Sequence, residues 1–130
     1  MKPAPAPAVM NWLGAQDAHA IFTTALTQAE LLYGVESMPA GKRRSQLAAA
    51  LEATLKEDFE GRVLPFNEDA ARLYALIVAA RNALGRPISQ FDAMIASIAR
   101  SHAAPLATRN VNDFAHCGIR LVDPWKDWKR

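Results

Sequence analysis

Segments with helical periodicity alternate with short apolar segments along this chain, and this alternation constrains the fold more than any other feature. The short apolar segments lie at residues 20–23, 62–66, 105–108 and 120–122. Uniformly apolar strands are typical of parallel sheets whose two faces are both covered by helices. We therefore predict an α/β fold, a parallel sheet flanked by helices, in which each short segment is one strand.

The segments between these strands carry helix signals. Gly and Pro residues delimit them, and apolar residues recur at helical spacing, as in Phe91, Ile95 and Ile98. The expected helices lie at residues 8–15, 27–38 and 41–60, and further helices begin at Asn67, at Ser89 and, for a brief one, at Asn110. With 130 residues, 51% of them hydrophobic, the chain suits a single domain over residues 1–130.

Three helix starts pair an N-capping side chain with a carboxylate three residues later. The pairs are Thr27 with Glu30, Ser89 with Asp92, and Asn110 with Asp113. One such pair is an ordinary helix start, because the cap accepts a backbone N–H bond and the acid faces the positive end of the helix. Since helices that follow parallel strands begin at one edge of the sheet, the three pairs together predict a cluster of acids there.

A cluster of this kind predicts a divalent-metal site. Carboxylates held close together repel one another, and a Mg²⁺ or Mn²⁺ ion relieves that repulsion. The ion can also activate a water molecule for attack on a phosphate. For each acid taken alone, a simple capping role is an equal alternative. We therefore take Glu30, Asp92 and Asp113 as candidate catalytic and metal-binding residues.

The remaining reactive residues suggest no competing site. The sequence contains no Gly-rich phosphate loop and no serine within a recognised nucleophile motif. The histidines are scattered along the chain. Arg109 lies next to the expected acids and is the candidate for contact with a nucleic-acid phosphate, with a solvated turn residue as the equal alternative.

Charge and composition restrict the cellular setting. The chain has 15 basic and 13 acidic residues, a formal charge of +2, which permits an RNA partner without requiring one. Cys117 is the only cysteine, so no internal disulfide forms and a reducing compartment is expected. No apolar run approaches the roughly 20 residues that span a bilayer, and residues 1–7 lack the apolar stretch of a signal peptide. We expect a cytoplasmic protein with no membrane segment.

Three motifs resemble those of a known family. They are TQAELLYG at residues 27–34, GRPISQFDAMIA at residues 85–96 and ATRNVNDF at residues 107–114. In this order they resemble the PIN-domain toxins of the VapC type, and the resemblance covers nearly the whole chain. It implies a metal-dependent endoribonuclease toxin that uses Mg²⁺ or Mn²⁺, forms a homodimer and is held inactive by a cognate antitoxin. By motif, Glu30, Asp92 and Asp113 match the family's second, third and fourth acids.

The family's first acid has no counterpart here. Members begin with an apolar strand that ends in Asp, whereas Asp17, the earliest acid of this chain, follows no apolar strand. We therefore expect a PIN-like domain that is N-terminally truncated relative to the family and lacks its first strand, either because Met1 is an internal methionine or because the gene is truncated. Since losing a carboxylate weakens metal binding and misaligns the attacking water, impaired activity is expected.

Two alternative functions stay open. One is a catalytically inactive PIN-like protein that binds a cognate antitoxin or a sister toxin. The other is an α/β phosphotransfer enzyme, which ranks lower because it needs an Asp nucleophile after the same first strand. Antitoxin binding without metal-dependent cleavage would favour the inactive binder over the nuclease.

Overall fold

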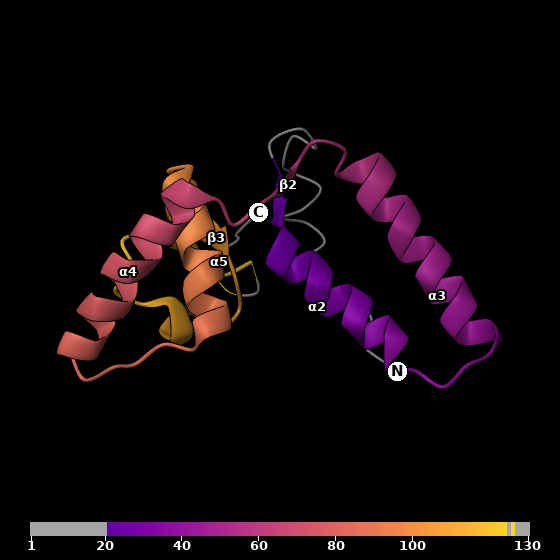
Figure 1. The fold of residues 1–130 in the computed structure, drawn as a ribbon, viewed down its shortest axis with the longest axis horizontal. Helices are drawn as coiled ribbons and strands as arrows, with labels where there is room; N and C mark the ends of the chain where they lie inside the picture. The colour runs from indigo at the N-terminus through magenta and orange to yellow at the C-terminus, as the bar shows by residue number, and fades with distance from the viewer. Residues whose placement is uncertain (1–20, 125, 127–130) are drawn as a thin grey trace.

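Helices alternate with short strands in the computed structural model, which describes residues 21–124 and residue 126 (Figure 1). The elements are β1 (Thr23–Thr24), α2 (Ala25–Glu36), α3 (Lys42–Ala53), the π-helical turn η2 (Thr54–Asp58), β2 (Val63–Leu64), α4 (Glu68–Ala83), α5 (Gln90–Ser101), β3 (Leu106–Ala107), the 3₁₀ turn η3 (Val111–Phe114) and β4 (Leu121–Val122). The helix expected at residues 8–15 and the acid Asp17 lie outside the described residues.

The strands form parallel pairs. β1 pairs with β2, with Thr23 opposite Val63, and β3 pairs with β4, with Leu106 opposite Leu121. The parallel direction confirms the prediction. In the described ranges, however, the strands form two separate two-stranded sheets instead of one continuous sheet. The two pairs are connected through helices, since α2, which follows β1, packs against α5, which precedes β3.

The core lies between α4 and α5, which pack side by side (Figure 1). As predicted, α5 carries a buried stripe. The buried core cluster consists of Ile77, Ala96, Phe114 and Cys117. Because Phe114 closes η3 and Cys117 follows it, this core anchors the segment that carries the candidate acid Asp113.

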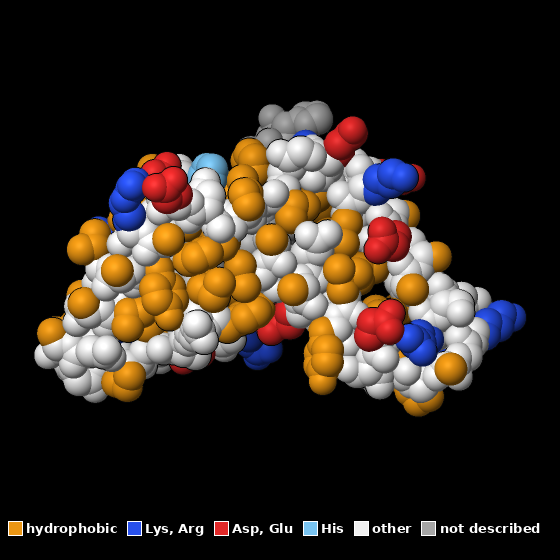
Figure 2. Space-filling model, viewed as in Figure 1, with side chains coloured by type: hydrophobic (Ala, Val, Ile, Leu, Met, Phe, Trp, Pro, Cys, Tyr) orange, Lys and Arg blue, Asp and Glu red, His pale blue; other side chains and the backbone are white. Residues whose placement is uncertain are grey.

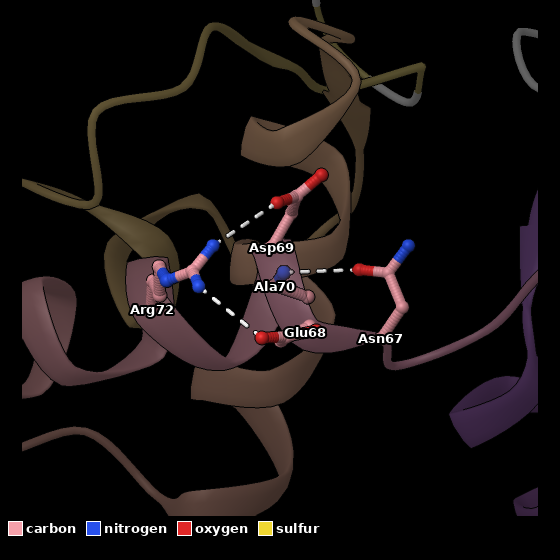
Figure 3. A network of polar contacts seen from close by, with 5 residues as sticks. All are labelled: Asn67, Glu68, Asp69, Ala70 and Arg72. Carbon is pink, nitrogen blue, oxygen red and sulfur yellow. Dashed lines mark hydrogen bonds and ion pairs between the residues drawn. The ribbon is translucent and has the colours of Figure 1, made fainter.

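The start of α4 shows how the local sequence sets a helix end (Figure 3). As predicted, Asn67 is the N-cap, and its Oδ1 accepts a hydrogen bond from the Ala70 N–H at 3.0 Å. Arg72 then pairs with Glu68 at 3.2 Å and with Asp69 at 3.6 Å. These ion pairs are solvent-exposed, so they contribute little to stability, and the cap is the main determinant of where α4 begins.

Helices α2 and α3 lie on the opposite side of the molecule from α4 (Figure 1). Neither helix contains a buried residue within the described chain. The basic start of α3 opposes the helix dipole, but Arg44 has a partner, because its Nη2 lies 2.7 Å from Oε2 of Glu36 at the end of α2. The α2–α3 half of the molecule therefore buries fewer side chains than the α4–α5 half.

Candidate functional site

Asp92 is held at the start of α5 by the cap that the sequence predicts. Ser89 adopts an extended backbone conformation, and its Oγ accepts a hydrogen bond from the Asp92 N–H at 3.1 Å. The Asp92 side chain is half-buried. The backbone of this acid is thus fixed relative to α5, which has more buried residues than any other described helix.

Asp113 lies in a different kind of turn from the one predicted. The brief helix expected from Asn110 is a four-residue 3₁₀ turn, and the Asn110 side chain makes no capping hydrogen bond. Instead, the Asn110 N–H donates to Thr108 Oγ1, and the Asp113 N–H donates to the Asn110 carbonyl at 3.0 Å. Asp113 is exposed, whereas the next residue, Phe114, is 6% exposed and packs in the core. The burial of Phe114 thus keeps Asp113 at the surface.

The capping pair predicted for Glu30 is wrong. The N-cap of α2 is Thr24, whose Oγ1 accepts a hydrogen bond from the Thr27 N–H at 3.1 Å. Both threonines are able to cap, but Thr24 ends strand β1 in an extended conformation, so the helix begins directly after the strand. Glu30 consequently lies beyond the first turn of α2 and is exposed. It is a surface acid rather than a capping acid.

The described carboxylates do not form a metal centre by themselves. Within residues 21–124 and 126, no three His, Cys, Asp or Glu side chains lie close enough together to hold an ion. Glu30, Asp92 and Asp113 come from three different elements, namely α2, α5 and η3. Within the described residues, therefore, these acids do not form a preassembled group of three ligands for a divalent ion.

A cleft of about 360 Å³ opens beside Asp113. Its lining residues are Arg109, Asn110, Val111, Asn112, Asp113, Asp123 and Lys126. The cleft therefore combines two carboxylates, two cations and two amide side chains. It is a polar site in which a phosphate group can meet positive charge and hydrogen-bond donors.

Asp123 is a further candidate residue, which none of the three capping pairs includes. It is 4% exposed, lines the cleft and directly follows strand β4. A signal was present in the sequence, because an acid at the carboxyl end of a parallel strand lies at the edge where α/β proteins bind ligands.

Known proteins are similar to this chain in sequence and in fold. The PIN domain family matches residues 4–118. The VapC ribonuclease Y4jK of Sinorhizobium fredii is 38% identical over 125 residues, or 96% of this chain and 89% of that protein. The crystal structure of FitAcB from Neisseria gonorrhoeae has a TM-score of 0.91 at 33% identity, covering 96% of this chain and 90% of that one. VapBC-5 from Mycobacterium tuberculosis, of the VapBC family of toxin-antitoxin systems, has a TM-score of 0.64 at 32% identity, covering 78% and 79%.

The fold and the family match together define the class: this chain belongs to the PIN-domain family. Within that family it is of the VapC type, as its similarity to Y4jK and to the FitAcB structure shows. The resemblance and fold class expected from the three sequence motifs are confirmed. The roles of Glu30, Asp92, Asp113 and Arg109 stay predictions.

Proposed function

We propose that this protein is the ribonuclease toxin of a toxin-antitoxin pair and hydrolyses RNA phosphodiester bonds. Its similarity to a VapC ribonuclease over 96% of the chain supports this activity. The structural observation that carries the proposal is the cleft beside Asp113. There Arg109 and Lys126 supply positive charge for a phosphate, while Asn110 and Asn112 supply hydrogen-bonding groups.

The proposed catalytic and metal-binding residues are Asp92, Asp113 and Glu30, with Arg109 as the phosphate contact. Asp92 is the strongest candidate, because the Ser89 cap fixes its backbone and its side chain is half-buried. Bound Mg²⁺ or Mn²⁺ would supply the activation of water for attack on phosphorus. We predict that the 130-residue chain is a weak nuclease, because its described acids are not gathered into a preassembled group that could hold the ion.

The proposed partners are a cognate antitoxin protein and a second copy of this chain. VapBC-5 belongs to a family of toxin-antitoxin systems, which supports the first of these. Large hydrophobic side chains also stay exposed on the described surface, such as Tyr33 at 74% and Leu76 at 58%. Figure 2 shows many hydrophobic side chains over the half of the molecule that carries α4 and α5. Surfaces of this kind are typical of protein interfaces.

The proposed location is the cytoplasm, where RNA and a cognate antitoxin are both available. No described helix combines the length and the apolar character that crossing a membrane requires.

Replacing the Asp92 carboxylate tests the proposal. Asp92→Asn keeps the size of the side chain and removes its charge, so we expect growth arrest and RNA cleavage to be lost while the far-UV circular dichroism spectrum is unchanged. The matched control is Asp69→Asn, which removes an acid whose side chain is 77% exposed at the start of α4. We expect this control to behave like the wild type. Growth arrest that persists in Asp92→Asn would show that Asp92 is not a catalytic residue.

A second candidate function is the catalytically inactive binder. The observation that favours it is that the described acids are not gathered into a metal-binding group. Capture of an antitoxin without any cleavage of RNA supports the binder, whereas cleavage that EDTA abolishes supports the nuclease. The same assay is run on an N-terminally extended chain if the gene encodes an in-frame upstream segment.

A further inference from the structure

Arg81, in the last turn of α4, is a buried cation that the proposed chemistry does not use. It is only 5% exposed. Its Nε donates to the Arg86 carbonyl at 2.6 Å, and its Nη1 donates to the carbonyls of Asp113 and Ala115, each at 2.9 Å. Longer contacts reach the Pro87 carbonyl at 3.5 Å and Cys117 Sγ at 3.6 Å. The guanidinium therefore binds two loops that are distant in sequence.

Packing alone does not explain an arginine at this position. Removing a cation from water carries a large desolvation cost, and Arg81 forms no ion pair with a carboxylate in the described part of the chain. Ile77, one turn earlier on the same helix, is 1% exposed and fills the core with an apolar side chain. Unlike an apolar residue, the arginine provides a planar set of N–H donors that bind loop carbonyls.

The two loops that Arg81 joins are those that carry candidate acids. The Arg86–Pro87 segment leads into the Ser89 cap, three residues before Asp92. The other carbonyls belong to Asp113 itself and to Ala115, directly after η3. This turn has few hydrogen bonds of its own, and one of them, from the Ala115 N–H to the Asn112 carbonyl, is long at 3.4 Å. The bonds from Arg81 thus add directly to the order of the turn.

We propose that Arg81 is a positioning residue of the nuclease, which fixes Asp113 relative to Asp92 by binding the backbone of both loops. The inference rests on the proposed ribonuclease function, since it gives Arg81 a purpose in aligning those acids. Lysine does not replace it, because one ammonium nitrogen does not reach the Arg86 carbonyl, which Nε binds, together with the Asp113 and Ala115 carbonyls, which Nη1 binds.

The kinetic test compares Arg81→Lys and Arg81→Met with two control variants on the same helix. Arg72→Met removes an exposed arginine, and Ile77→Val trims the core without touching a hydrogen bond. We expect the two Arg81 variants to lower kcat for RNA cleavage about 10- to 100-fold with KM changed less than about twofold, because misplaced groups act only on the chemical step. Both controls should keep kcat within about twofold.

A second readout does not depend on activity. Backbone hydrogen exchange at residues 113–117 is expected to rise at least tenfold in Arg81→Lys, while exchange in the middle of α5 stays unchanged. A wild-type chain that cleaves no RNA would count against the proposed function alone, and the exchange result would still decide whether Arg81 orders the turn. The inference is overturned if residues 113–117 of Arg81→Lys exchange as in the wild type. It is also overturned if Ile77→Val lowers kcat as much as Arg81→Met does. A third contradicting result is that both Arg81 variants unfold under conditions in which Ile77→Val stays folded.

Discussion

At the scale of single residues, short-range hydrogen bonds decide where the helices begin. Asn67 and Ser89 could be predicted as caps because each accepts the N–H three residues later and directly precedes a segment with helical periodicity. The capping role predicted for Thr27 is wrong because a second threonine, Thr24, lies three residues earlier at the end of a strand and caps the helix instead. A local pattern therefore predicts a cap well only where a single candidate is present.

The cap at the start of α5 gives a stability prediction. Ser89→Ala removes the side-chain acceptor for the Asp92 N–H and should lower the free energy of unfolding by about 1 kcal/mol. Ser45→Ala is the control, since this exposed serine lies within α3 and its change should stay within about 0.5 kcal/mol. Urea unfolding followed by circular dichroism measures both. Equal effects of the two substitutions would contradict the capping role.

Replacing either of two glycines by alanine should change the stability of the protein, in opposite directions. Gly118 has a φ of 77°, and an added Cβ would lie 3.0 Å from Cζ of Arg100, so Gly118→Ala should destabilise the protein by about 1 kcal/mol or more. Gly34 lies within α2 with open space around it, so Gly34→Ala should stabilise by about 0.5–1 kcal/mol through helix propensity. The midpoint of thermal unfolding, measured for both variants, tests whether the first is destabilised and the second stabilised. A Gly118→Ala variant as stable as the wild type would show that the turn relaxes.

At the scale of elements, the helices differ in how firmly they are held. The apolar stripe of α5 could be predicted from its periodicity, since a stripe at helical spacing must face a core. The form of η3 could not be, because Phe114 docks in the core and pulls the chain out of helical geometry after a single 3₁₀ turn. Tertiary packing overrides local capping where a segment is this short.

This contrast predicts a gradient of local stability. Helix α3 has no buried residue among those the structure describes, whereas α5 has several, so α3 should open by local fluctuations and α5 only on global unfolding. Native-state hydrogen exchange measured amide by amide tests this difference. Exchange in the middle of α3 should be at least about tenfold faster than in the middle of α5. Equal protection of the two helices would contradict the view that α2 and α3 are weakly held.

At the scale of the whole molecule, the direction of the strands was predictable but their grouping was not. Apolar strands alternating with helices imply parallel pairing, as in β1 with β2 and β3 with β4. Whether those pairs join depends on which segment lies between them, and no local pattern encodes that. The contacts of Arg81 are equally unpredictable from local patterns, since its acceptors at Asp113 and Ala115 lie more than 30 residues away in sequence. Such long-range contacts are visible only in the folded chain.

Cleavage of a defined RNA by the purified protein tests the central claim, a nuclease whose activity resides in its acids. The initial rate is measured with Mg²⁺ and with EDTA for the wild type, for Asp92→Asn and for the exposed-acid control Asp69→Asn. The account predicts cleavage by the wild type and by Asp69→Asn that EDTA abolishes, and no cleavage by Asp92→Asn. Equal rates for the wild type and Asp92→Asn, or a rate that EDTA leaves unchanged, would contradict it.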